Sequence, residues 1–79
     1  MYSKFFVIYF SPSNELKVSP IVSKKISKKA VVRNKIKRRI RNLFKEKIGY
    51  FAVIAKNDIS QINYKELIND VEQAINKIN

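Results

Sequence analysis

The sequence predicts one small α+β domain, an α/β sandwich with elements in the order β-β-α-β-α. Two short segments, Lys4–Phe10 and Tyr50–Ala55, are dense in aromatic and β-branched residues, which is typical of buried strands. Two longer segments repeat apolar residues at steps of three or four, which is typical of amphipathic helices. A chain of 79 residues is enough for a single hydrophobic core, so residues 1–79 form one domain.

The N-terminal third predicts two strands joined by a turn. In Lys4–Phe10 alternate side chains point to opposite faces, and one face must be core, but the sequence leaves open which. The two sets are Phe5, Val7 and Tyr9, and Phe6, Ile8 and Phe10. Ser11–Asn14 has the residues of a turn, so Leu16–Ser23 is expected to return as an antiparallel strand. Pro20 lacks an amide hydrogen, which indicates an edge position or a bulge.

A basic amphipathic helix is expected from Ala30 onward. Its apolar stripe comprises Val32, Ile36, Ile40, Leu43, Phe44 and Ile48. Between Ser23 and Lys45 the chain has 11 Lys/Arg and no acidic residue, whereas the other positions have six Lys/Arg and six Asp/Glu. The net charge of +11 therefore lies within this one segment. Like charges repel along a helix, so we expect an external polyanion rather than a merely solvated face, and nucleic acid is the commonest polyanion.

The start of this helix favours the same conclusion. Ser27 is the expected N-cap, since its hydroxyl can accept a hydrogen bond from a first-turn N–H. Lys24, Lys25, Lys28 and Lys29 surround that helix end, where the macrodipole favours anions instead. Free N–H groups beside ammonium groups predict a phosphate-binding site.

The C-terminal part predicts a strand and a closing helix. Gly49, the only glycine, is expected at the C′ position after the basic helix, and Tyr50–Ala55 as a buried strand. Asn63 is the expected N-cap of the last helix, with Glu66 completing a capping box. The apolar stripe that follows is Tyr64, Leu67, Ile68, Val71, Ile75 and Ile78.

The segment SKKISKKAVVRNKIKRRIR closely resembles the basic signature of the bacterial ribonuclease P protein component. The family pattern has VSKK at a strand end and AVxRNRxKRxxRxxF on a helix. The matching residues are Val22, Ser23, Lys24, Lys25, Ala30, Val31, Arg33, Asn34, Lys35, Lys37, Arg38, Arg41 and Phe44. Lys35 replaces an arginine of the pattern, and a lysine offers a point charge where arginine offers a planar fork.

The resemblance covers the whole chain and adds detail to the fold. It implies a left-handed βαβ crossover, against the usual rule, as in ribosomal protein S5 domain 2-like folds. The family's N-terminal helix is expected to be missing here, because the first strand begins almost at Met1. That would leave one sheet face uncovered, so we also expect self-association through it.

The resemblance implies the protein subunit of the ribonuclease P ribonucleoprotein, a single RNA-binding domain that assists 5′ maturation of tRNA. Its partners would be the catalytic RNA and the 5′ leader of precursor tRNA. Hydrolysis would be carried out by the RNA subunit with Mg²⁺, and the protein would hold no cofactor. The leader would meet Tyr9 and Phe5, because aromatic rings stack on unpaired bases. The expected RNA-binding residues are Lys24, Lys25, Lys28, Lys29, Arg33, Asn34, Lys35, Lys37, Arg38 and Arg41.

Composition also limits the chemistry. The chain has no histidine and no cysteine, so it lacks a conventional general base and a nucleophile–base pair, and its carboxylates are scattered. We expect no catalytic residue and no metal site in the protein. The longest apolar run, Phe5–Phe10, is too short to span a membrane, and the absence of cysteine fits a cytoplasmic protein.

Two rival functions remain at this level. One is a different RNA-binding module, such as a small ribosomal protein, which would share the basic helix but not act in tRNA processing. The other is a DNA-binding domain whose basic helix enters a major groove. The long apolar stripe of that helix argues against deep insertion into a groove.

Overall fold

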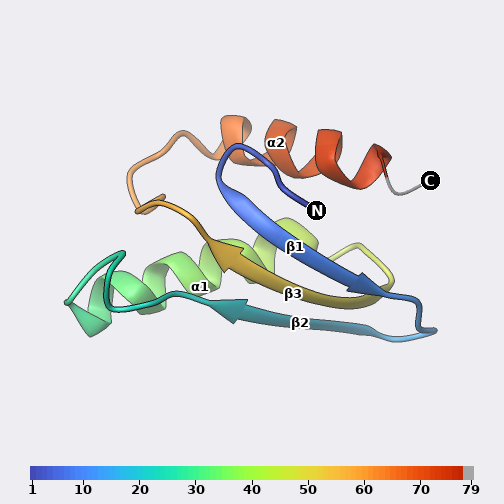
Figure 1. The fold of residues 1–79 in the computed structure, drawn as a ribbon, viewed down its shortest axis with the longest axis horizontal. Coiled ribbons are helices and arrows are strands. Elements are labelled where there is room, and N and C mark those ends of the chain that lie inside the picture. The colour runs from blue at the N-terminus through green and yellow to red at the C-terminus, as the bar shows by residue number, and fades with distance from the viewer. Residues whose placement is uncertain (78–79) are drawn as a thin grey trace.

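The computed structural model describes residues 1–77, and their five elements follow the predicted order. The elements are β1 (Phe6–Ser11), β2 (Leu16–Ile21), α1 (Ala30–Phe44), β3 (Gly49–Ala55) and α2 (Tyr64–Asn76). The three strands form one mixed sheet in the order β1-β3-β2 (Figure 1). The predicted α+β class and element order are therefore confirmed.

The pairing of the strands differs from a simple hairpin. β2 runs opposite to β1, as expected, but it does not pair with β1, because β3 lies between them. β3 is antiparallel to β1 and parallel to β2, so β2, α1 and β3 form a βαβ unit. β2 is an edge strand, which accommodates Pro20. The handedness of the crossover stays a prediction from the family resemblance.

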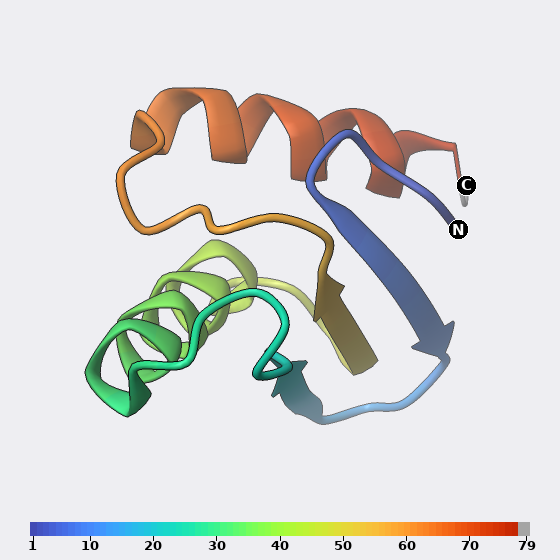
Figure 2. The same ribbon diagram turned by 60° about the vertical axis from the view of Figure 1, so that its left-hand side comes forward.

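Both helices cover the same face of the sheet, and no other element of residues 1–77 lies over the opposite face (Figure 2). The covered face of β1 carries Phe6 and Ile8, and that of β3 carries Phe51 and Val53. This settles the choice between the two faces of β1: the set with Phe6, Ile8 and Phe10 faces the core. The buried helix residues in the same cluster are Ile36, Ile40, Leu43, Phe44, Leu67, Val71 and Ala74. Each helix thus contributes most of the apolar stripe that its sequence predicts, but Ile68, predicted in the stripe of the last helix, is 37% exposed.

The boundaries of α1 correct two predictions. Lys29, not Ser27, is the N-cap, and it makes no side-chain capping bond. The Ser27 hydroxyl instead accepts a hydrogen bond from the Lys29 amide at 3.2 Å, so it shapes the turn before the helix. The helix ends at Phe44, and Ile48 beyond it is 70% exposed rather than part of the stripe.

Gly49 is not a helix C′ residue, as the sequence suggested, but the first residue of β3. Its φ of +128° lies in a region that side chains disfavour. A Cβ atom at this position would lie 2.5 Å from a ring carbon of Phe10. The glycine is therefore required by the sheet and by the ring packed over it.

α2 begins at the predicted N-cap, but the Asn63 side chain accepts from the Lys65 amide, at 2.9 Å, rather than from the Glu66 amide that the predicted capping box requires. Glu66 lies in the first turn, where a carboxylate suits the helix dipole. Ile78, predicted as the last residue of the stripe, lies outside the described residues.

Candidate nucleic-acid interface

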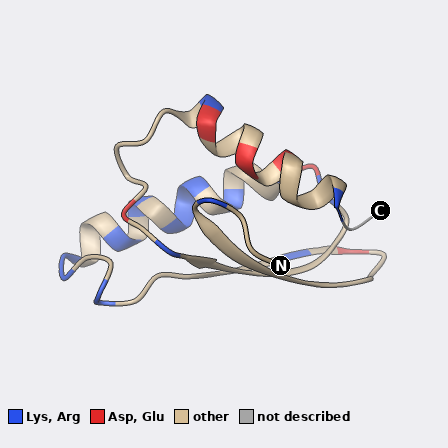
Figure 3. Cartoon of the chain, turned by 45° about the horizontal axis from the view of Figure 1, so that its top comes forward, with Lys and Arg blue, Asp and Glu red and all other residues tan. Residues whose placement is uncertain are grey.

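The two helices carry opposite charge. α1 has arginines and lysines and no acidic residue, whereas Glu66, Asp70 and Glu72 lie on α2. Figure 3 shows this separation, with blue segments along α1 and red segments along α2. A polyanion would therefore be attracted to the α1 side of the domain.

The turn that precedes α1 presents the first lysines. It is closed by a hydrogen bond from the Ile26 amide to the Ser23 carbonyl at 3.1 Å, and Ile26 packs against the core. Lys24 and Lys25 lie in this turn, exposed, rather than at the strand end itself. Because the turn is anchored, the backbone that carries these two lysines has a defined position beside the start of the helix.

One flank of α1 continues this basic surface. Arg33, Lys37 and Arg41 are spaced four residues apart and so form one row along the helix. Arg33 donates from Nη1 to the Ser27 carbonyl at 2.9 Å, which joins the row to the preceding turn. Asn34 and Arg38 are exposed next to the row. We define the basic surface by these residues together with the turn lysines: Lys24, Lys25, Lys28, Lys29, Arg33, Asn34, Lys37, Arg38 and Arg41.

Lys35, also predicted to bind RNA, belongs to a different flank. It lies near enough to Asp58, in the segment between β3 and α2, to act on that carboxyl electrostatically. Hydrogen bonds from the Ser60 side chain and amide lower the pKa of Asp58, and the charge of Lys35 lowers it further. The structure thus does not bring Lys35 together with the row of Arg33, Lys37 and Arg41, because it projects toward the other side of the helix.

A second candidate surface lies on the open face of the sheet. Tyr9 is 58% exposed and Tyr50 is 43% exposed, and both line a shallow hollow of about 470 Å³. Lys17 pairs with Tyr50 across the strands and adds a cation to the hollow. Exposed aromatic rings beside a lysine suit single-stranded nucleic acid. The sequence predicts Tyr9 at this surface but not Tyr50, because Tyr50–Ala55 is expected to be a buried strand. Side chains alternate between the two faces of a strand, so a buried Phe51 indicates that Tyr50 lies on the open face.

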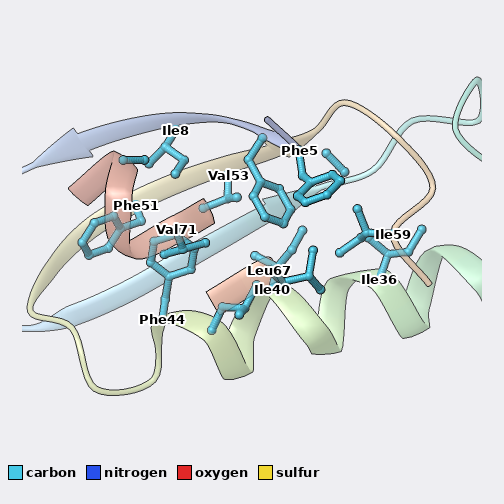
Figure 4. Packing of buried hydrophobic residues seen from close by; sticks show 14 of the residues in the cluster. Phe5, Ile8, Ile36, Ile40, Phe44, Phe51, Val53, Ile59, Leu67 and Val71 are labelled. Atoms are coloured by element: carbon cyan, nitrogen blue, oxygen red, sulfur yellow. The ribbon is translucent and has the colours of Figure 1, made fainter. Parts of the chain in front are cut away.

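Phe5, the other residue predicted to bind the leader, is only 7% exposed and belongs to the core (Figure 4). That prediction is wrong because the strand begins at Phe6, two residues later than predicted, and the chain bends at Lys4 and Phe5. Their amides donate to the two carboxylate oxygens of Asp70 at 2.8 and 3.0 Å. The bend turns the Phe5 ring inward, away from the face that carries Tyr9.

Three of the six carboxylates have structural partners within the domain. Asp70 holds the N-terminal bend, and Glu72 forms an ion pair with Lys47 at 2.6 Å. The Asp58 side chain accepts from the Ser60 amide at 2.9 Å. Within residues 1–77 no three potential ligand side chains gather in a way that could hold a metal ion. None of the helices described is long and apolar enough to cross a membrane.

A one-sided α/β sandwich with a basic helix on one side and exposed tyrosines on the sheet defines a small nucleic-acid-binding domain. The family model described as Ribonuclease P matches residues 1–79, and the chain belongs to this family. It is 38% identical over 77 residues to the "Ribonuclease P protein component" of Thermus scotoductus, covering 94% of this chain and 47% of the relative. The protein of the same name from Thermus brockianus is 41% identical over 69 residues, covering 84% and 42%.

A solved structure of an RNase P protein is also similar to this chain. The Staphylococcus aureus RNase P protein superposes with a TM-score of 0.78 at 28% identity, covering 100% of this chain and 79% of that one. The chain spans about half the length of the curated relatives that it matches, 47% and 42% in the two cases above. Membership of the Ribonuclease P family argues against both alternatives, the small ribosomal protein and the DNA-binding domain.

Proposed function

We propose that the chain acts as the protein subunit of ribonuclease P, the ribonucleoprotein that matures the 5′ end of tRNA. In this role it binds the catalytic RNA and the 5′ leader of precursor tRNA. The observation that carries the proposal is the basic surface: a motif of the family, on an anchored turn and one flank of α1, with no acidic residue among its members.

The RNA subunit binds the basic surface through its phosphates. The turn lysines and the row of Arg33, Lys37 and Arg41 give a line of cations, which neutralises phosphate charge and releases counterions. Arg38 and Asn34 extend the contact on the exposed side of the helix. Lys35 contributes less than its motif position implies, because it lies on the flank near Asp58.

The leader of the precursor tRNA binds the open face of the sheet. Tyr9 and Tyr50 offer ring surfaces on which bases stack without regard to sequence, and Lys17 offers a charge for the backbone. The protein supplies no catalytic residue, so the hydrolysis belongs to the RNA subunit and its Mg²⁺ ions. The protein holds both RNAs together and reduces the repulsion between their phosphates.

Tyr50→Ala tests the leader site, and Tyr2→Ala is the matched control. Tyr2 is 74% exposed but does not line the hollow around Tyr50. In the complex reconstituted with a bacterial ribonuclease P RNA, Tyr50→Ala should weaken binding of precursor tRNA by about 1–3 kcal/mol, the value of one stacked base. Binding of tRNA without a leader, and both affinities of Tyr2→Ala, should stay unchanged. An equal loss for tRNA with and without the leader would place the leader elsewhere.

A further inference from the structure

We propose that Arg39 positions the basic helix and makes no contact with RNA. It lies within the basic run and has the charge of its neighbours, but its side chain is engaged inside the domain. The inference rests on the proposed function, because it divides the cations of α1 into those that meet the RNA and one that holds them in place.

The contacts of Arg39 are with the segment that links β3 to α2. Its Nη1 donates to the carbonyl of Ile59 and, at 2.8 Å, to that of Ile62. Its guanidinium carbon lies 5.9 Å from the ring centroid of Tyr64, the first residue of α2. One side chain thus ties the middle of α1 to the linking segment and to the start of the other helix.

Those acceptors are themselves fixed. Ile59 is fully buried, and Figure 4 shows it beside Ile36 of α1. The amide of Ile62 donates to the Ile59 carbonyl at 3.3 Å, so the two acceptor carbonyls belong to one compact turn. A guanidinium bound to carbonyls on a buried turn has a defined position, and it restrains the helix from which it comes.

The flank of Arg39 faces away from the basic row. Arg39 is two residues from Lys37 and from Arg41, which separates it from each by about 200° around the helix axis. Its side chain is half-buried, whereas that of its neighbour Arg38 is exposed. A phosphate on the basic surface therefore does not reach Arg39 while the contacts with Ile59 and Ile62 are made.

Repulsion between the cations of α1 makes such a restraint necessary. The apolar stripe anchors α1 to the core, but its cations repel one another, and a small rotation or shift would displace every cation of the row together. Arg39 opposes that movement from the α2 side. Loss of the restraint would misplace the phosphate contacts without removing any of them.

The test compares Arg39→Gln with Arg38→Gln as the matched control, in binding to a bacterial ribonuclease P RNA at several salt concentrations. For Arg39→Gln we expect affinity about two- to thirtyfold weaker, the range for residues that act on a binding site through the contacts between them. The slope of log K against log salt should equal that of the wild type. For Arg38→Gln the slope should become shallower by about 0.7–0.9. Circular dichroism at the binding temperature shows whether each variant is folded.

Each possible result of these binding measurements either supports or overturns the proposal. A shallower slope for Arg39→Gln would mean that Arg39 contacts phosphate, and unchanged affinity in the folded variant would mean that it serves stability alone; either overturns the proposal. If Arg39→Gln does not fold, Arg39→Lys replaces it. The shorter side chain should bind the carbonyls less well and weaken RNA binding at constant slope, and wild-type affinity would overturn the proposal. Wild-type protein that fails to bind the RNA would instead refute the proposed function.

Discussion

Gly49→Ala is predicted to destabilise the domain through the close approach of Gly49 and Phe10. At φ of +128° an alanine is strained, which costs about 1–3 kcal/mol. Its Cβ would also lie 2.5 Å from a Phe10 ring carbon, so the ring must move. That movement disturbs the contact with Phe51, whose ring centroid is 5.1 Å away, and adds about 1 kcal/mol of overpacking. For a domain of this size, about 2–4 kcal/mol corresponds to a Tm lower by roughly 10–30 °C.

Thermal unfolding followed by circular dichroism measures this loss. Phe10→Leu removes the ring that the new methyl group meets, so the double variant separates the two contributions. Gly49→Ala together with Phe10→Leu should lose less than the sum of the single variants, because only the backbone strain of residue 49 remains. A Tm for Gly49→Ala within about 2 °C of the wild type would show that neither the strain at residue 49 nor the contact with Phe10 destabilises the variant.

Three further predictions concern charge and assembly. If the basic surface neutralises about four to six phosphates, log K for RNA should fall with log salt at a slope of roughly −3 to −5. Arg41→Gln should make this slope shallower, whereas Lys65→Gln on α2 should leave it unchanged. Binding that does not depend on salt would contradict phosphate docking. Hydrogen bonds from Ser60 hold the pKa of Asp58 below its ordinary 3.8. Their contribution to stability is therefore fully present above pH 3.8 and is lost as the pH falls through the lowered pKa of Asp58. The Tm difference between wild type and Asp58→Asn should therefore be present at pH 7 and shrink below about pH 4, and a gap that widens in acid would exclude this origin. Because Tyr9 and Tyr50 are exposed on an open sheet face, the expected self-association should appear in sedimentation at rising concentration, and a monomer throughout would contradict it.

The parts of the fold that the sequence predicts are those set by local pattern. The stripe of Ile36, Ile40 and Phe44 defines the buried face of α1, because helical periodicity is fixed by the backbone. The Asn63 cap likewise depends on residues close in sequence. The basic surface was predictable for the same reason: the motif places its cations on a helix of known periodicity.

The remaining features depend on contacts between distant residues. The bend that buries Phe5 is held by Asp70, 65 positions along the chain, so strand alternation alone placed Phe5 on the wrong face. The separation of Lys35 from the row of basic residues depends on where the linking segment with Asp58 packs. The place of β3 between β1 and β2 is likewise a tertiary result, since each strand segment alone is equally able to pair with either neighbour.

In the proposed function this chain assists an RNA catalyst and performs no hydrolysis itself. The most direct measurement is cleavage of precursor tRNA by a bacterial ribonuclease P RNA, with and without the protein, over a series of Mg²⁺ concentrations. We expect that the protein alone cleaves nothing and that it lowers the Mg²⁺ concentration at which the RNA cleaves, because its basic surface reduces phosphate repulsion. An unchanged Mg²⁺ requirement, or cleavage that persists after all ribonuclease P RNA has been removed, would contradict it.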